Sequence, residues 1–190
     1  MTKRILKPGT MIYPIPSVMV SCSDKNGNKN IITIAWTGTI CSDPPMAYIS
    51  VRKERHSYDI IAESGCFVIN LPTEKLVKEM DYCGVASGRD IDKFHACGLT
   101  AAQASVVSAP LIEECPVNIE CRVKEIVSLG SHDMFIAEVV AVNASEHLFN
   151  KEGKLHLNKA GFVTYCHGEY RNLGGTLGSF GYSVRKKPMK

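Results

Sequence analysis

The fold of this chain is decided by residues 30–59, which read NIITIAWTGTICSDPPMAYISVRKERHSYD. Two apolar runs in this stretch are separated by Pro44-Pro45, and they predict two strands. Small and hydroxyl residues surround Trp36, while cationic and hydroxyl residues end the second run at 52–57. Two such strands could bind one ligand in two places. The small residues around Trp36 would contact a planar ring, and the cationic and hydroxyl residues at 52–57 would bind an anionic group attached to that ring.

Length and composition indicate one globular domain. The 190 residues are 45% hydrophobic and 22% charged, which is ordinary for a globular protein of this size. The net charge of +3, with dispersed basic residues, argues against a nucleic-acid partner. No run of about 18 apolar residues is present to span a membrane, and residues 1–9 lack the apolar core of a signal peptide. We therefore expect a cytoplasmic protein with one domain over 1–190, of which 171–190 form a C-terminal extension.

The apolar pattern predicts a mainly β chain with few helices. Strands are expected at 11–23, 30–37, 46–51, 67–71, 117–127 and 134–142, and helices at 57–65 and from 73 onward. A loop is expected at 84–93, and another short helical piece after it. Asn26-Gly27 predicts a hairpin turn, because this pair readily adopts positive φ. Ser57 or His56 is expected to cap the first helix and Gly65 to end it. Since the strands come as neighbouring hairpins, an antiparallel barrel is favoured over a doubly wound parallel sheet.

The cysteines do not form a metal-binding pattern. Eight of them are scattered through apolar runs, and no Cys-x-x-Cys pair occurs. Cys115 and Cys121, six residues apart, are expected on one strand with about 20 Å between them. We therefore expect reduced, mostly buried thiols and no metal site.

A cationic group of residues points to an anion site. Ser57 lies at a predicted helix start, where free N–H groups and the helix dipole attract negative charge. The basic side chains that can add charge-assisted bonds to phosphate oxygens are Arg52, His56, Arg89 and Lys93. The alternative is that Ser57 only caps the helix and the charges are solvated. In the same way, Trp36 is either a core residue or the platform for a ring.

Motifs of other site types are absent. The stretch from Gly174 to Gly178 lacks both the Gly-Lys-Ser/Thr ending and the strand–glycine–helix context of a phosphate-binding loop. Neither His-Glu-x-x-His nor Gly-x-Ser-x-Gly occurs. The sequence thus argues against a Rossmann site and a hydrolase, and no catalytic residue is predicted.

Five motifs follow one another along the chain. They are Asn30-x-x-Thr33-x-Ala35-Trp36, Ser42-Asp43-Pro44-Pro45, Arg55-His56-Ser57-Tyr58, Ser64-Gly65-x-Phe67-Val68-x-Asn70-Leu71-Pro72 and Ser87-Gly88-Arg89-Asp90-x-Asp92-Lys93-Phe94. Together they resemble the flavin reductase-like family over about residues 10–185. A last motif, Leu177-Gly178-x-x-Gly181-Tyr182-Ser183, is most similar to the flavoredoxin branch. The resemblance implies a mainly β fold, the antiparallel Greek-key split β-barrel that binds FMN.

The resemblance also implies a cofactor site. FMN would bind non-covalently in a groove at a homodimer interface, with Asn30 and Trp36 along the ring and ribityl chain. Ser57 and Lys93 would hold the phosphate. The implied cofactor-binding residues are Asn30, Ala35, Trp36, Thr37, Gly38, Thr39, Arg52, His56, Ser57, Arg89, Lys93, His132 and Tyr165.

The implied activity is that of an oxidoreductase. Hydride from NADH or NADPH would reach the flavin, which would pass electrons to free flavin or a redox partner protein. One alternative is an FMN-binding electron carrier without NAD(P)H activity, and another is a split barrel that binds a different flat ligand such as haem. The sequence leaves open whether residues 174–181 cover the flavin and whether any thiol takes part in electron transfer.

Overall fold

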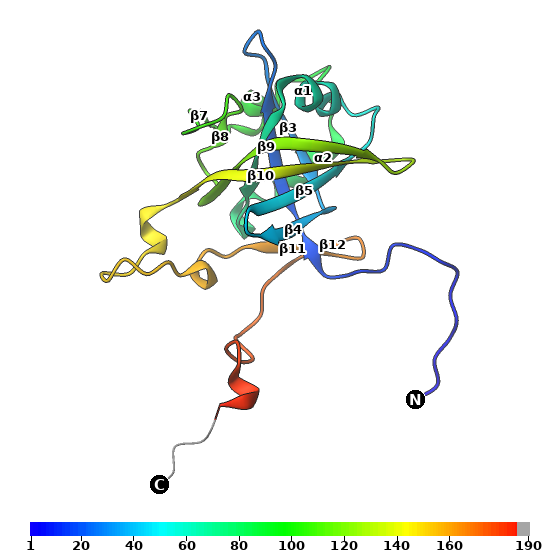
Figure 1. Cartoon of the computed structure of the whole chain (residues 1–190), viewed down its shortest axis with the longest axis vertical. Helices are drawn as coiled ribbons and strands as arrows, with labels where there is room; N and C mark the ends of the chain where they lie inside the picture. Colours follow the sequence, from blue (N-terminus) through cyan, green and yellow to red (C-terminus); the bar gives the residue numbers. More distant parts are fainter. Residues whose placement is uncertain (186–190) are drawn as a thin grey trace.

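The computed structural model describes residues 1–185, and the last part of the expected C-terminal extension, 186–190, lies outside the described residues. A seven-stranded antiparallel sheet forms the body, with strand order β3-β2-β6-β9-β10-β5-β4 (Figure 1). Its strands are β2 (Val18–Ser23), β3 (Lys29–Ile34), β4 (Thr37–Ser42), β5 (Pro45–Val51), β6 (Cys66–Leu71), β9 (Val117–Ser128) and β10 (Asp133–Ala144). Because β2 pairs with β6 and β5 with β10, neighbours in the sheet are distant in sequence, as in a Greek key. The mainly antiparallel β fold is confirmed.

The expected strand at 30–37 is wrong at its C-terminal end, and β4 was not predicted. The chain bends at Ala35 and Trp36, where Thr37 N–H donates to the Ala35 carbonyl (3.1 Å) and Ser50 N–H to the Trp36 carbonyl (2.9 Å). Before the bend β3 pairs with β2, and after it β4 pairs with β5. The two halves of one apolar run thus become the opposite edges of the sheet, so the barrel is split between them.

Alternating side chains of the strands fill the barrel. Val18, Val20 and Cys22 of β2 point inward together, as the two-residue period of a strand requires. The same core takes Phe67 and Phe135, both fully buried. Removing either ring would cost about 3–5 kcal/mol, so this core fixes the register of the strands that carry the site.

Three helices, α1 (His56–Ser64), α2 (Val77–Val85) and α3 (Lys93–Cys97), complete the body. The expected cap of α1 is wrong: Arg55 is the N-cap and makes no side-chain cap bond, while Ser57 is the second helical residue. Gly65 ends α1 in the left-handed region (φ 66°), as predicted. The helices α2 and α3 pack on the outer face of β2 and β3 through Met80, Cys83 and Phe94.

Two small sheets were not predicted, because their strands are short and lack alternation. One pairs β7 (Ala101–Ala102) with β8 (Leu111–Ile112), and the other has the order β1 (Ile15–Pro16), β11 (Val163–Cys166) and β12 (Glu169–Asn172). Short 3₁₀ turns occur at Glu74–Leu76, Glu146–Leu148, Leu157–Lys159 and Tyr182–Val184. The β11–β12 hairpin brings Tyr165 and Tyr170 back beside the barrel.

Both ends of the described chain leave the barrel (Figure 1). The N-terminal arm precedes β1, and the segment after β12 runs away from the body. In that segment Leu177 and Phe180 are fully exposed. Within residues 1–185, no helix has the length and apolar character needed to cross a membrane.

Candidate functional site

Two adjoining cavities lie beside the bend between β3 and β4. The first, of about 310 Å³, is lined by Ser17, Ile32, Thr33, Ile34, Ala35, Trp36, Ser50, Val51, Arg52, Arg55, Asp81, Gly84, Val85, His132, Tyr165 and Tyr170. The second, of about 190 Å³, is lined by Asn30, Ile32, Glu54, Arg55, His56, Ser57, Val85, Ala86, Ser87, Gly88, Arg89 and Lys93. Ile32, Arg55 and Val85 line both, so the two cavities are neighbours along β3. We call them the ring cavity and the anion cavity.

Aromatic side chains from distant segments wall the ring cavity. Trp36, at the bend, contacts His132 of the β9–β10 turn, with ring centroids 5.5 Å apart and planes tilted by 42°. Tyr165 and Tyr170 contact each other from β11 and β12, with centroids 5.8 Å apart. Trp36 is 44% exposed, so it is not a core residue. The ring cavity therefore presents π surfaces suited to a flat, apolar ligand.

The N-terminus of α1 opens into the anion cavity. Ser57 is buried at the start of the helix, and its Oγ accepts a hydrogen bond of 2.8 Å from Asn30 Nδ2 on β3. The first N–H groups of a helix lack intrahelical partners, and they carry the positive end of the helix dipole. The helix start and the Asn30–Ser57 pair thus offer hydrogen-bond donors at one place.

Lys93 brings a buried positive charge to the same cavity. Its Nζ donates to the carbonyls of Ile31 (2.7 Å) and Cys83 (2.8 Å), and the residue is 2% exposed. An ammonium has three protons, so one donor is left over for a ligand. Burial lowers the pKa of Lys93. An anion bound beside it would compensate the cost of burying this charge.

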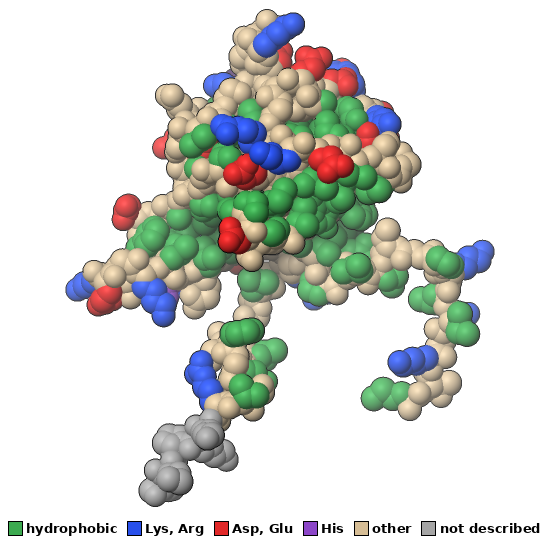
Figure 2. Space-filling model, viewed as in Figure 1, with side chains coloured by type: hydrophobic (Ala, Val, Ile, Leu, Met, Phe, Trp, Pro, Cys, Tyr) green, Lys and Arg blue, Asp and Glu red, His purple; other side chains and the backbone are tan. Residues whose placement is uncertain are grey.

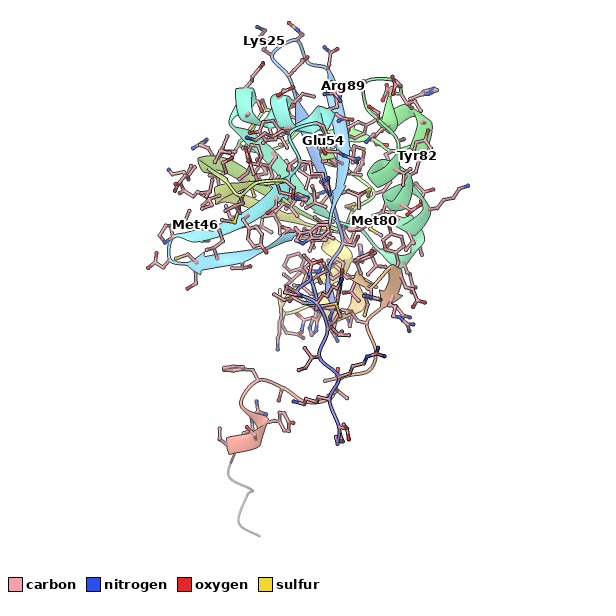
Figure 3. All side chains as sticks on the ribbon, turned by 90° about the vertical axis from the view of Figure 1, so that its right-hand side faces the viewer. Lys25, Met46, Glu54, Met80, Tyr82 and Arg89 are labelled. Atoms are coloured by element: carbon pink, nitrogen blue, oxygen red, sulfur yellow. The ribbon has the colours of Figure 1, made fainter. Side chains whose placement is uncertain are left out.

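The charges around the anion cavity are mostly positive. Arg55, at the N-cap of α1, donates to the carbonyl of Gly84. Arg89 donates through Nη1 to the carbonyl of Glu54 (2.9 Å), and Figure 3 shows these two side chains near each other beside β3. Partial burial and the positive charges of Arg89 and Lys93 lower the pKa of His56. A phosphate would be well matched to this field.

Gly88 makes room in the anion cavity. A Cβ added at Gly88 would lie 2.2 Å from Asn30 Oδ1, so only glycine allows the loop between α2 and α3 to pass this close. The loop thereby comes down on Asn30 and contributes Ser87 and Gly88 to the wall. A backbone that approaches a polar side chain so closely is typical of a loop that wraps a ligand.

The structure brings ten of the thirteen predicted site residues to the two cavities. Ala35, Trp36, Arg52, His132 and Tyr165 line the ring cavity, and Asn30, His56, Ser57, Arg89 and Lys93 line the anion cavity. The other three lie on β4 and line neither cavity. Thr37 donates its hydroxyl to the Tyr48 carbonyl (2.7 Å), and Gly38 faces the Tyr48 ring. For all thirteen, contact with a flavin remains a prediction.

Several lining residues were missed from the sequence. Arg55, which lines both cavities, stands in the run Arg52–His56, and this run was the available signal. Tyr170 was missed because the β11–β12 hairpin was not predicted. No three His, Cys, Asp or Glu side chains within residues 1–185 lie close enough to bind a metal ion.

Comparisons with known proteins agree with this geometry. The model of the flavin reductase like domain matches residues 10–174. The flavoredoxin of Desulfovibrio vulgaris (Miyazaki F) is similar in structure, with a TM-score of 0.90 and 32% identity over 97% of this chain and all of that one. The flavoredoxin of Methanosarcina acetivorans gives 0.87 and 29% over the same shares. The protein YddH of Escherichia coli is 31% identical over 70% of this chain and 72% of its own.

Proposed function

Because the chain belongs to the flavin reductase-like family, we propose that it binds FMN non-covalently along the two cavities and works as a flavin-dependent oxidoreductase. One observation carries this proposal: an aromatic cavity lies next to a cavity that combines a helix N-terminus with the buried ammonium of Lys93. A flat ring joined to a phosphate by a short chain matches both halves at once. The similarity to two flavoredoxins supports the same cofactor.

The residues present fit FMN. The phosphate would receive the N–H groups at the start of α1, the Ser57 hydroxyl and Lys93 Nζ. The ribityl chain would pass Asn30 and Arg55 where the cavities join, and the ring would lie between Trp36 and the two tyrosines. When bound, FMN supplies the redox chemistry. The protein would hold the ring and neutralise the charge of the phosphate, and the partly exposed Trp36 would leave the ring accessible from solvent.

NADH or NADPH is the electron donor in this proposal, and free flavin or a redox partner protein is the acceptor. Arg52 supports it, since this exposed guanidinium lies at the rim of the ring cavity, where it can pair with the phosphates of a dinucleotide. A second candidate function is an FMN-binding carrier reduced by another protein. The partly exposed Trp36 in the wall of the ring cavity suits either electron source.

A homodimer is part of the same proposal. Apolar side chains gather over β10, β5 and β4 in Figure 2. Ile40 of β4 is 48% exposed and Val142 of β10 is 58% exposed, and apolar side chains left in water are costly. A second copy would cover such side chains. We expect sedimentation velocity to give a dimer, and Ile40→Glu with Val142→Glu to shift it to monomer; a monomeric parent would contradict the dimer.

The test begins with the absorbance spectrum of the purified protein. We expect flavin bands, and release by heat should yield FMN on chromatography. Failure to bind added FMN would overturn the proposal, while a Soret band would indicate haem instead.

Anaerobic mixing of the FMN-loaded protein with NADH, and separately with NADPH, then distinguishes the two functions. Bleaching within seconds supports the reductase. A sample that stays oxidised with both nucleotides, but is reduced by a ferredoxin-type donor, supports the carrier.

A further inference from the structure

Two thiols are in contact beneath the anion cavity. Cys83 of α2 and Cys97, the last residue of α3, have their sulfurs 3.9 Å apart. Both are free; Cys83 is fully buried, and Cys97 is partly exposed. A disulfide bond is about 2.05 Å long, so the sulfurs need to approach by about 2 Å to form one.

The pair brackets the loop that closes the anion cavity. The loop, residues 86–92, follows the last turn of α2, in which Cys83 lies, and returns to α3, which begins at Lys93. Val85 at the end of α2 and Ser87 and Gly88 of this loop line the cavity. The carbonyl of Cys83 also accepts a hydrogen bond from Lys93 Nζ (2.8 Å). A covalent bond between residues 83 and 97 would therefore join the two ends of the cavity-forming segment.

We propose that Cys83 and Cys97 are a reversible modification site, at which thiol–disulfide exchange with a low-molecular-weight disulfide such as oxidised glutathione joins α2 to α3. The partly exposed Cys97 reacts first. Its thiolate attacks the small disulfide, forms a mixed disulfide and releases one small thiol. The Cys83 thiolate then attacks the Cys97 sulfur and releases the second small thiol. Two protein thiols are oxidised, one small disulfide is reduced, and the two protons end on the small thiols.

The surroundings of the pair make the exchange slow near neutral pH. Burial raises the pKa of Cys83 to about 12. Burial raises the pKa of Cys97, and the negative charge of Glu79 on α2 adds to this, against the opposing effects of the Cys83 contact and the positive charge of Lys93 on α3. Since the thiolate is the nucleophile, the rate should rise about tenfold per pH unit while the thiols remain protonated. The site would thus respond to a sustained oxidising shift and not to a brief one.

Formation of the bond would hold the loop over its ligand. Opening of the loop is a local event that requires its ends to separate, and a covalent link between those ends removes part of this freedom. In the oxidised protein FMN should therefore dissociate more slowly. This consequence rests on the proposed function, whereas formation of the disulfide does not.

The test uses the full chain, first fully reduced and then incubated with oxidised glutathione at pH 7, 8 and 9. We expect peptide mapping to find a bond between residues 83 and 97, which removes two of the eight thiols and is reversed by dithiothreitol. Cys97→Ser should lose the reaction at this site, and Cys83→Ser should stop at a mixed disulfide on Cys97. Cys166→Ser, which removes a partly exposed thiol on β11, is the matched control and should form the bond normally.

The outcomes distinguish formation of the disulfide from its effect on the loop. A parent chain that stays reduced at both positions at pH 9, or that maps to other pairs, overturns the modification site even if a serine variant fails to fold. If the bond forms but FMN leaves at an unchanged rate, the loop-holding role is wrong. If the protein binds no flavin at all, the proposed function fails while the mapped disulfide still supports the site.

Discussion

The two cavities are built in different ways. The anion cavity takes all its lining residues from positions 30–93, and its central groups are buried and hydrogen-bonded within the chain. The ring cavity takes Trp36 from the bend after β3, His132 from the β9–β10 turn and Tyr165 from β11. Trp36 remains nearly half exposed. The anion half is therefore formed by one stretch of the chain with its central groups hydrogen-bonded in place, whereas the ring half is assembled from distant segments and open to solvent.

This difference indicates that the anion cavity mainly provides binding affinity and the ring cavity mainly provides access to the reacting ring. A rigid site with a buried charge can supply most of the affinity, because its groups lose little freedom when the ligand binds. An open site leaves the reacting ring accessible to a donor and an acceptor. Riboflavin, which has the ring but lacks the phosphate, separates the two contributions. We expect variants of the anion cavity to weaken FMN alone, and variants of the ring cavity to weaken both flavins.

The largest effect is expected for Lys93→Met. The variant loses a charged hydrogen bond to the phosphate, worth about 1.5–3 kcal/mol, so the Kd for FMN should rise roughly 10- to 150-fold. Riboflavin should bind as it does to the parent. Fluorescence titration of the apoprotein measures both values.

Lys75→Met is the control for Lys93→Met, because Lys75 is exposed in the 3₁₀ turn before α2. It should change neither Kd. In Lys93→Met the carbonyls of Ile31 and Cys83 lose their hydrogen-bond donor. Thermal unfolding checks that the variant is still folded. An equal loss of FMN and riboflavin affinity would mean that Lys93 acts on the fold and not on the phosphate.

A smaller effect is expected for Gly88→Ala. The backbone at Gly88 needs no positive φ, so the new methyl group acts only through its clash with Asn30 Oδ1. Overpacking of this kind costs about 1–3 kcal/mol, and we expect FMN to bind about tenfold more weakly. Gly174→Ala is the matched control, since nothing lies within 4 Å of a Cβ there. Unchanged FMN binding by Gly88→Ala would show that the loop does not close on the ligand.

Trp36→Ala tests the contribution of the ring cavity to flavin binding. Loss of an aromatic contact is worth about 0.5–1.5 kcal/mol, so both FMN and riboflavin should bind about two- to tenfold more weakly. Trp36→Phe retains a ring and should recover most of the affinity. A variant in which FMN weakens but riboflavin does not would contradict the assignment of Trp36 to the ring half.

The sequence predicted the parts of the fold that local chemistry controls. Asn26-Gly27 forms the turn between β2 and β3, with Gly27 at φ 84°, and Gly65 ends α1. The break at Ala35 and Trp36 was missed because the run continues with apolar and β-branched residues on both sides. Its position depends on which neighbours β3 and β4 find, and pairing partners that are distant in sequence leave no local signal.

The site also divides into residues with a local sequence signal and residues that only the packing of distant segments brings in. Ser57, Arg89 and Lys93 were identifiable as a cationic group with a helix start, although the exact cap residue was wrong. His132 and Tyr165 came only from the family resemblance, because nothing near them in sequence indicates a cavity. Tyr170 had neither signal. Cys83 and Cys97 are ordinary apolar-run cysteines until the packing of α2 on α3 brings their sulfurs together.

The smallest effect is expected for a substitution at Asp133, whose hydrogen bonds link the ring cavity to the anion cavity. Its carboxylate accepts hydrogen bonds from Tyr58 on α1 (2.6 Å) and Ser128 on β9 (2.9 Å), and Lys53 lies 3.4 Å away. The Tyr58 hydroxyl lowers the pKa of Asp133. A carboxylate with a lowered folded-state pKa stabilises the protein above its unfolded pKa of about 3.9, and this stabilisation is lost as the pH falls through the folded-state value. Asp133→Asn should therefore reduce the free energy of unfolding at pH 7.

Urea unfolding at pH 7 and at pH 3 measures this contribution, and the difference between parent and Asp133→Asn should shrink at the lower pH. Asp90→Asn, at an exposed position, should leave the free energy of unfolding unchanged at both. Because Asp133 adjoins His132 and Tyr58 adjoins Ser57, the bond holds the turn of the ring cavity against the helix of the anion cavity. An Asp133→Asn variant as stable as the parent at pH 7 would mean that the two cavities keep their places through the sheet alone.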